Sequence, residues 1–322
     1  MGYKRPDMKT TTATAGLLIA ASVFSSLAFA SVTIDWVTVG NAGNAADVNR
    51  HGAVGHEYKI GKYEVTNAQY GAFLNAKGQS NAHGIYNSSM SSYGITQSGS
   101  VGSYTYSVTT ALANRPVVYV SWFDAARFAN WLANGQGSGD TETGSYTLNG
   151  ATSGIIFKNA AAEVYIPTDE EWYKAAFYNG STSTYSAYAN GQNMITTAEA
   201  NFGNSVGSST NVGTYSASSY YGTFDQSGNV WEWNGPGYVY SIEEVTVSQR
   251  GGYWSGASSG YASINGYYGI HYWDLVSRGS NIGRVSTTED NISGFRLAAV
   301  PEPTSMLLSI FAGGVMLIRR NR

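Results

Sequence analysis

Regular secondary structure is restricted to a small part of this chain, and that restriction limits the possible folds more than any other feature. Four long stretches rich in glycine, serine, tyrosine and asparagine show little hydrophobic periodicity: residues 77–112, 134–160, 179–223 and 255–285. Loops this long are unusual in a compact domain, and they are typical of folds in which irregular segments pack on a small scaffold and carry the function. The 25 tyrosines and 8 tryptophans argue against disorder for most of these stretches, because their rings can bury apolar area.

Three short helices are predicted between these loops, each opened by a residue suited to capping. Thr66 and Gln69 form a capping-box pattern that begins a helix over residues 67–76. Ser121 begins a second helix, and Thr168 begins a third whose acidic first turn suits the positive end of the helix dipole. Apolar side chains at i, i+3 and i+4 give the first two helices one buried face each.

Two strands are predicted beside these helices. Residues 58–65 alternate like a half-buried strand that runs into the first helix, and residues 117–120 form a short buried strand. No internal repeat is found. The chain therefore combines a few short helices and strands with long connecting loops.

Residues 1–30 are predicted to be a secretory signal peptide. Basic residues precede an apolar run from Ala15 to Ala30, which ends on the small-residue cleavage pattern Ala28-Phe29-Ala30. The alternative is an N-terminal membrane anchor, although the run is short and serines interrupt it. Cleavage would leave a mature chain that begins at Ser31.

Residues 301–322 are predicted to be a sorting signal with three parts. The motif Pro301-Glu302-Pro303 comes first, an apolar run over 306–318 follows, and a basic tail with Arg319 and Arg320 closes the chain. The run is shorter than the ~20 residues that cross a bilayer comfortably, and arginines behind it suit a cytoplasmic end. The order of these parts resembles the PEP-CTERM signal of Gram-negative bacteria.

This resemblance implies a route for the protein. An exosortase-type membrane protease would recognise the signal and cleave near residues 301–303. The C-terminal helix would anchor the chain transiently in the inner membrane, and the product would reach the cell surface or the extracellular matrix. A plain C-terminal tail anchor is the alternative.

Composition excludes several classes of function for residues 31–300. The chain contains no cysteine, so an exported form has neither disulfides nor thiolate chemistry. Charged residues make up 12% of the chain, the net charge is −3 and no basic patch is visible, so nucleic acid is not an expected partner. The length allows one large domain or two small ones.

Six short blocks follow one another between residues 58 and 298: residues 63–70, 116–125, 165–172, 224–233, 250–252 and 293–296. The most specific are Gly-Asn-Val-Trp-Glu-Trp at 228–233, Arg-Gly-Gly at 250–252 and Gly-Phe-Arg at 294–296. In this order the blocks resemble those of the formylglycine-generating enzyme (sulfatase-modifying factor) family. The resemblance implies a single loop-rich α+β domain over residues 31–300, the formylglycine-generating variant of the C-type lectin fold.

The resemblance also implies a structural calcium site in the fourth block. Its ligands would be the Asn229 side chain, the Val230 carbonyl and the Glu232 carboxylate, and calcium does prefer several oxygen ligands. The alternative is that Glu232 forms a buried ion pair with Arg250 or Arg296.

A second calcium site of the family would use Asn201 and the Phe202 carbonyl. Its acidic ligand is replaced near Gly213, where the sequence has no acid. The sequence therefore supports the second site less than the first.

The family's oxidase chemistry depends on a pair of copper-binding cysteines. The corresponding positions fall near Gly256 and Tyr261, which cannot bind copper(I) as thiolates, so no copper and no oxidase activity are expected. No other catalytic set is evident. The histidines at 51, 56, 83 and 271 lack metal-ligand spacing and are predicted to be solvated loop residues, and no nucleophile elbow is present.

The family's active-site groove would be lined here by the segment 255–285. Tyrosine, serine and glycine on loops of a rigid scaffold are typical of a recognition surface, because tyrosine offers large contact area at low entropy cost. Aromatic faces also suit sugar rings. The alternative is that these aromatic residues fill the core. The predicted groove residues are Tyr261, Tyr267, Tyr268, His271, Tyr272, Trp273 and Asp274.

Three functions remain open from the sequence. The first is an exported, surface-associated, non-catalytic module that binds a peptide or an extracellular polysaccharide. The second is a divergent enzyme of the family with chemistry that needs no cysteine. The third is a structural protein of a biofilm or matrix, in which the domain acts as a spacer.

Overall fold

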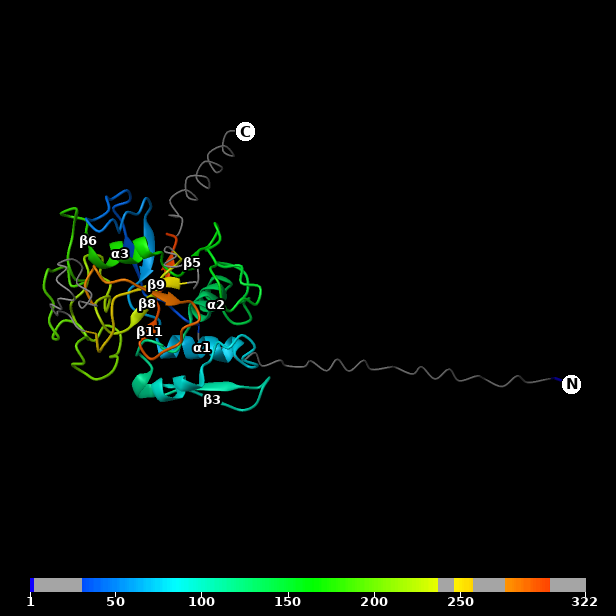
Figure 1. The fold of residues 1–322 in the computed structure, drawn as a ribbon. Helices are drawn as coiled ribbons and strands as arrows, with labels where there is room; N and C mark the ends of the chain where they lie inside the picture. The colour runs from blue at the N-terminus through cyan, green and yellow to red at the C-terminus, as the bar shows by residue number, and fades with distance from the viewer. Residues whose placement is uncertain (3–30, 237–245, 257–275, 302–322) are drawn as a thin grey trace, which may run out of the picture.

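A computed structural model describes residues 1–2, 31–236, 246–256 and 276–301 (Figure 1). Three α-helices lie in this part of the chain: α1 (Asn67–Lys77), α2 (Trp122–Ala133) and α3 (Asp169–Phe177). Two short 3-10 helices, η1 (Ser88–Tyr93) and η2 (Thr110–Leu112), lie between α1 and α2. The predicted α+β class is confirmed, with strands that are short and loops that are long.

All three predicted helix starts are confirmed, and each helix begins with a complete capping box. Thr66 accepts a hydrogen bond from the backbone N–H of Gln69, whose side chain accepts one from the Thr66 N–H. Ser121 caps α2 and Thr168 caps α3 in the same reciprocal way. Each box satisfies backbone donors that the first turn of a helix leaves free, which is why the start can be predicted from a few adjacent residues.

Two four-stranded sheets form the scaffold. The first has the order β1 (Trp36–Val39), β2 (Tyr58–Gly61), β12 (Ala298–Ala299), β5 (Val164–Tyr165), with every pair antiparallel. The second has the order β10 (Ile282–Val285), β9 (Thr246–Arg250), β8 (Trp231–Trp233), β11 (Ser293–Gly294), in which β11 runs parallel to β8. In the first sheet, β12 therefore lies between β2 and β5, two strands from the first half of the domain.

Two small hairpins complete the described strands. β3 (Ile95–Ser98) pairs with β4 (Thr105–Val108), and β6 (Tyr178–Asn179) pairs with β7 (Thr184–Tyr185). Residues 179–223 gather on one side of the molecule, and helices α1 and α2 lie on the other (Figure 1). Residues 179–223 thus cover one flank of a small packed scaffold.

Both strand predictions were wrong in extent. The strand expected over residues 58–65 stops at Gly61, and the chain then turns so that the Val65 N–H bonds the Phe295 carbonyl. Residues 117–120 are not a strand. Tyr119 has φ of 60° and its N–H bonds the Asp290 carbonyl, so the pleat is broken at that residue.

The main core is aromatic and lies between α1 and α2. Tyr70 of α1 stacks on Phe128 of α2 with ring centroids 5.9 Å apart, and Phe73 lies 5.3 Å from Trp131. Buried polar tips find backbone partners, as when Trp233 Nε1 donates to the Val120 carbonyl at 2.9 Å. Packing and satisfied ring N–H and O–H groups therefore hold together a domain that has no disulfide.

The predicted terminal signals lie almost entirely outside the described residues. Pro301 is described, whereas Glu302, Pro303, Arg319 and Arg320 are not, and neither is the apolar run of the predicted signal peptide. No helix within the described ranges is long and apolar enough to cross a membrane.

Candidate functional site

A fully buried ion pair joins three of the sequence blocks. Arg296 donates to both carboxylate oxygens of Glu232, at 2.5 Å from Nε and 2.6 Å from Nη2. Trp172 Nε1 donates to the same carboxylate at 2.7 Å. Arg296 also donates to the carbonyls of Gly61 and Phe224. Of the two alternatives for Glu232, the structure contains the ion pair with Arg296.

Asn229 sits beside this pair in a left-handed turn. Its φ is 60°, after a Gly228 with φ of 100°, where an added Cβ would lie 2.2 Å from the Asn201 carbonyl oxygen. Asn229 Nδ2 donates to Glu64 Oε1 at 2.9 Å, and its Oδ1 accepts from Asn201 Nδ2 at 3.3 Å. The turn therefore requires glycine and brings Asn201, Asn229 and Glu64 together.

This cluster has buried oxygens that the protein does not satisfy. Within the described residues, Glu64 Oε2 and Asn201 Oδ1 are buried and have no hydrogen-bond partner. Burial raises the pKa of Glu64 well above its usual value, and the nearby carboxylates of Asp225 and Glu232 raise it further. Burial likewise raises the pKa of Asp225 to about 6. Arg296 binds the Glu232 carboxylate, so a cation beside Glu64 would supply the positive charge that its ionised carboxyl lacks.

Sequence reasoning missed two of these acids. Glu64 lies in the first block and Asp225 in the fourth, but neither was identified as a candidate ligand. The structure places Asp225 at the position where an acid was lacking, because the N–H of Gly213 donates to Asp225 Oδ2 at 2.6 Å. A pocket of about 310 Å³ borders the cluster, and Asp35, Tyr63 and Glu64 are among its lining residues.

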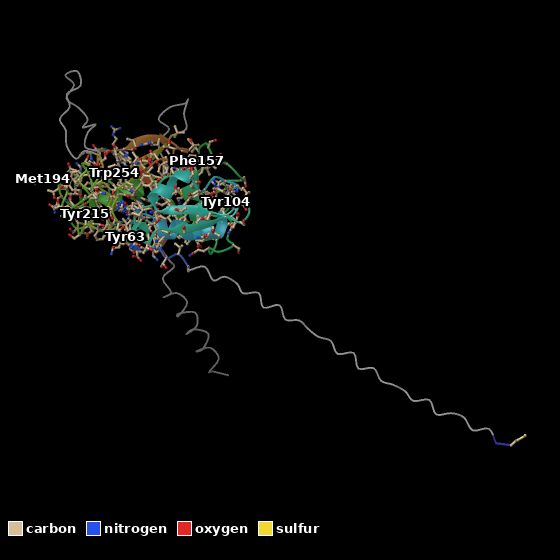
Figure 2. The ribbon with its side chains drawn as sticks, turned by 90° about the horizontal axis from the view of Figure 1, so that it is seen from below. Tyr63, Tyr104, Phe157, Met194, Tyr215 and Trp254 are labelled. Atoms are coloured by element: carbon tan, nitrogen blue, oxygen red, sulfur yellow. The ribbon has the colours of Figure 1, made fainter. Side chains whose placement is uncertain are left out.

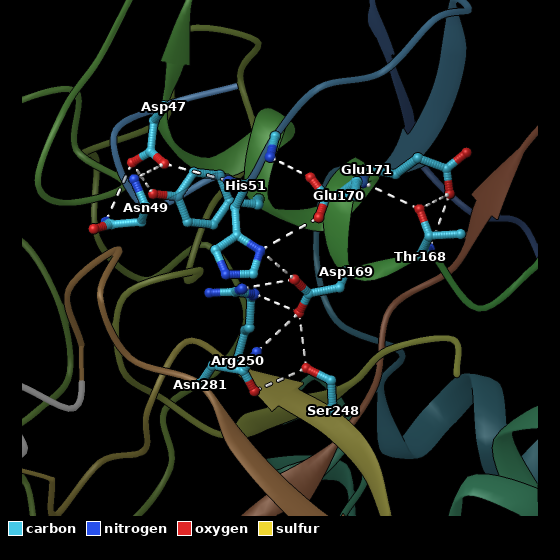
Figure 3. Close-up of polar contacts among 12 residues, drawn as sticks. Asp47, Asn49, His51, Thr168, Asp169, Glu170, Glu171, Ser248, Arg250 and Asn281 are labelled. Atoms are coloured by element: carbon cyan, nitrogen blue, oxygen red, sulfur yellow. Dashed lines mark hydrogen bonds and ion pairs between the residues drawn. The ribbon is translucent and has the colours of Figure 1, made fainter. Parts of the chain in front are cut away.

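A second polar cluster centres on Asp169 at the start of α3 (Figure 3). Arg250 donates to both oxygens of Asp169 at 2.6 Å, and Ser248 donates to Oδ1 at 2.8 Å. His51 Nδ1 lies 3.1 Å from Asp169 Oδ2 and 3.3 Å from Glu170 Oε1. Hydrogen bonds to Asp169 and Glu170 raise the pKa of His51 to about 9.

The expectation of a solvated His51 was wrong, because its side chain is only 16% exposed. One ligand atom each from His51, Asp169 and Glu170 lie within 4.8 Å of one another, which would also suit a metal ion. Arg250 occupies both oxygens of Asp169, however, so a cation would have to displace a bidentate guanidinium. The cluster is therefore best described as a charge-balanced network of two acids with Arg250 and protonated His51.

A pocket of about 290 Å³ is lined in part by Trp254, four residues after the end of β9. Trp254 is on its wall, two residues before Gly256, and this ring is labelled in Figure 2 on the same side of the molecule as Tyr215 and Met194. Arg115 is the charged residue of the lining. The lining consists of Ser92, Tyr93, Leu112, Arg115, Pro116, Val118, Gly207, Ser208, Ser209, Trp254 and Asn291.

The pocket borders the position expected for the family's first cysteine. The family resemblance implies that this cysteine would fall near Gly256, whose carbonyl accepts a hydrogen bond from the Gly203 N–H. All of the predicted groove residues lie outside the described residues: Tyr261, Tyr267, Tyr268, His271, Tyr272, Trp273 and Asp274. Sequence reasoning did not identify Trp254 or Arg115 as site residues, although Trp254 lies two residues after the Arg-Gly-Gly block.

Comparisons with known proteins agree with this architecture. The family model for the sulfatase-modifying factor enzyme 1-like domain matches residues 32–300. The solved structure of Treponema denticola variable protein 1 is similar, with a TM-score of 0.54 and 21% identity over 85% of this chain and 97% of that chain. The crystal structure of CarF has a TM-score of 0.54 and 22% identity over 84% of this chain and 99% of that chain. No curated protein matches.

The two structural likenesses establish the fold. The family model extends across both sheets, all three helices and every motif block described above. On that basis the chain belongs to the sulfatase-modifying factor, or formylglycine-generating enzyme, family.

Proposed function

We propose that this protein is an exported, surface-associated binding module that uses the family fold without the family's oxidase chemistry. Its ligand is a peptide segment or an extracellular polysaccharide. The observation that carries the proposal is the pocket lined by Trp254 and Arg115, which presents aromatic, hydroxyl, amide and guanidinium groups two residues before the position where the resemblance implies a cysteine.

The pocket suits recognition because its walls belong to well-anchored backbone. Both backbone groups of Arg115 are hydrogen bonded, to the Leu112 carbonyl and to the Asn67 N–H at the start of α1. The Trp254 N–H bonds the Asn229 carbonyl, and its own carbonyl accepts from the Asn204 N–H. A site held on fixed backbone loses little conformational entropy on binding.

Calcium is proposed as a structural ion at the Asn201 cluster. The unsatisfied Asn201 Oδ1 and Glu64 Oε2 support a cation there, with the Phe202 carbonyl as a further oxygen ligand. The first ligand set fits less well, because Arg296 and Trp172 already occupy the Glu232 carboxylate, while Asn229 Oδ1 accepts from the Thr210 N–H. Bound calcium would favour the ionised forms of the Glu64 and Asp225 carboxyl groups, which burial disfavours.

Export and surface attachment are proposed from the terminal sequence signals. Residues 1–30 would direct secretion, and residues 301–322 would engage an exosortase-type protease. Mass spectrometry of the protein isolated from the cell surface tests this division. Mature ends near Ser31 and Pro301 are expected, and an intact C-terminal apolar run would instead support a tail anchor.

Binding is tested with the exported protein on an array of glycans, extracellular polysaccharides and peptides, with calcium and then with chelator. Trp254→Ala is expected to abolish binding, and Tyr220→Ala is the control because that ring is exposed and outside the pocket lining. Loss of binding in both variants, or in neither, would place the ligand elsewhere. No binding to any array member would contradict the proposal and favour a structural matrix role.

A further inference from the structure

Arg115 differs from Arg127, Arg250, Arg284 and Arg296 in the partner of its guanidinium group. Arg127, Arg250, Arg284 and Arg296 each form an ion pair with a carboxylate. Across the described ranges, Arg115 has no acidic partner, and its guanidinium makes one hydrogen bond, from Nη1 to Ser208 Oγ at 3.1 Å. Since a guanidinium has five N–H donors, most of its donors remain available to a ligand.

The described lining of the pocket around Arg115 carries a positive charge and no negative one. Among these described lining residues there is no aspartate or glutamate. The acid nearest in sequence to the lining residue Asn291 is Asp290, which is bound by Arg284 at 2.6 Å. A ligand with one negative charge would therefore meet an uncompensated cation on entering.

The remaining groups of the pocket match a sugar ring. Trp254 and Tyr93 offer aromatic faces, and three serines and Asn291 offer donors and acceptors for hydroxyl groups. A volume of about 290 Å³ is at the lower end of ligand pockets. The space suits one pyranose residue better than several residues of an extended peptide.

The pocket residue Tyr93 packs against Tyr119, whose backbone is strained. Tyr119 has a φ of 60°, which is rare for an aromatic residue, and its ring lies 5.2 Å from that of Tyr93. Tyr93 in turn accepts a hydrogen bond on its hydroxyl from Asn291 Nδ2 at 2.9 Å. Strain of this kind persists where surrounding structure enforces it and is common at ligand sites.

We propose that this pocket binds a uronic acid residue of an extracellular polysaccharide, with Arg115 binding the sugar carboxylate. The inference rests on the proposed function, in that the pocket must bind a ligand at all. One guanidinium matches the single charge of a carboxylate, whereas phosphate groups carry more charge and favour clusters of basic residues. A planar guanidinium also fits a planar carboxylate through two parallel hydrogen bonds.

The test uses the exported protein and three matched ligands: an oligogalacturonate, the same oligosaccharide with its carboxyl groups reduced to alcohols, and a sulfated neutral oligosaccharide of equal length. Calorimetry is expected to give the tightest binding for the oligogalacturonate. Reduction of the carboxyl groups is expected to weaken binding by roughly 10-fold to 100-fold, as for loss of a charge-assisted hydrogen bond. Equal binding of the sulfated ligand would overturn the carboxylate assignment.

Variants assign the effect to Arg115. Arg115→Gln is expected to weaken uronate binding by the same roughly 10-fold to 100-fold and to leave binding of the reduced oligosaccharide unchanged. Arg50→Gln is the matched control, since Arg50 is exposed and outside the pocket. Arg115→Lys keeps the charge and serves if Arg115→Gln fails to fold; it is expected to bind uronate with intermediate affinity, because it loses the second parallel hydrogen bond.

The outcomes separate this inference from the proposed function. Binding of neutral glycans that Trp254→Ala abolishes and Arg115→Gln leaves intact would overturn the uronate assignment and keep the binding module. Binding of acidic peptides in preference to oligogalacturonate would overturn the sugar assignment. Failure to bind any glycan or peptide would contradict the proposed function itself.

Discussion

At the scale of single residues, charge burial dominates this protein. Arg296 is fully buried and supplies the guanidinium nearest to three carboxylates, those of Glu232, Glu64 and Asp225. Its N–H groups also bond backbone carbonyls on both sides of the site. The Gly-Phe-Arg block therefore serves the fold, because one side chain ties the second sheet to the segment after β2.

Arg296→Met is expected to destabilise the fold by about 3–5 kcal/mol, because it leaves the Glu232 carboxylate buried without its partner. Urea denaturation measures the change in the free energy of unfolding. The control is Arg50→Met, which removes an exposed guanidinium and is expected to change stability by less than ~0.5 kcal/mol. Similar midpoints for the two variants would show that the buried pair is not required.

His51 is expected to make stability depend on pH on the alkaline side. Its folded pKa of about 9 lies above the ordinary value of 6.5, so its contribution is complete below about 6.5 and is lost as the pH rises through about 9. Denaturation midpoints of wild type and His51→Gln are therefore expected to differ most near pH 6 and to converge by pH 10. A difference that is constant across this range would contradict protonation of His51 in the folded protein.

Glu64 is the residue through which the calcium proposal can be tested. Calcium is expected to raise the melting temperature of wild type, because a ligand that binds the folded state stabilises it. Glu64→Gln is expected to remove that rise, and to stabilise the calcium-free protein because it replaces an unfavourably buried carboxylate. Glu163→Gln is the control, because Glu163 is exposed and lies immediately before β5. A calcium effect that survives Glu64→Gln would place the ion elsewhere.

At the scale of elements, the helices were predictable and the strands were not. Each helix start depends on residues three positions apart, so the capping boxes at Thr66, Ser121 and Thr168 can be recognised without knowledge of the fold. A strand exists only where a partner lies beside it. Residues 117–120 look like a strand in sequence, yet no strand pairs with them and Tyr119 breaks their pleat.

Ser121→Ala is expected to lower the free energy of unfolding by about 1 to 2 kcal/mol, because it removes the N-cap of α2. The Ser121 hydroxyl accepts from the Asp124 N–H and donates to the Asp124 carboxylate, all in a buried setting. Ser216→Ala, at an exposed loop position, is the control and is expected to be neutral. A loss below ~0.3 kcal/mol for Ser121→Ala would mean that packing alone determines where α2 begins.

At the scale of the whole molecule, a family fold has been kept without the cysteines of the family chemistry. Residues 32–300 match the family model, while the chain contains no cysteine at all. The scaffold does not depend on cysteines, because aromatic packing and buried ion pairs stabilise it. Loops carried on such a scaffold can change their ligand without changing the fold.

The protein is therefore expected not to convert the cysteine of a sulfatase-type peptide into an aldehyde, with or without copper. Soft thiolate ligands are what select copper(I), and this chain offers none. Mass spectrometry of the peptide after incubation measures the outcome, with an active family member as the positive control. A peptide aldehyde would contradict the non-catalytic proposal.

The sequence alone determined the family, the three helix starts and the absence of thiol chemistry, because each depends on residue identity or on neighbours within one turn. Only the tertiary structure decided that Glu232 pairs with Arg296, 64 residues away, and that Glu64 meets Asn229, 165 residues away. It likewise decided that Arg115 meets Trp254 at one pocket. Burial and charge pairing depend on which distant segments pack together, and the periodicity of a loop-rich chain carries little information about that packing.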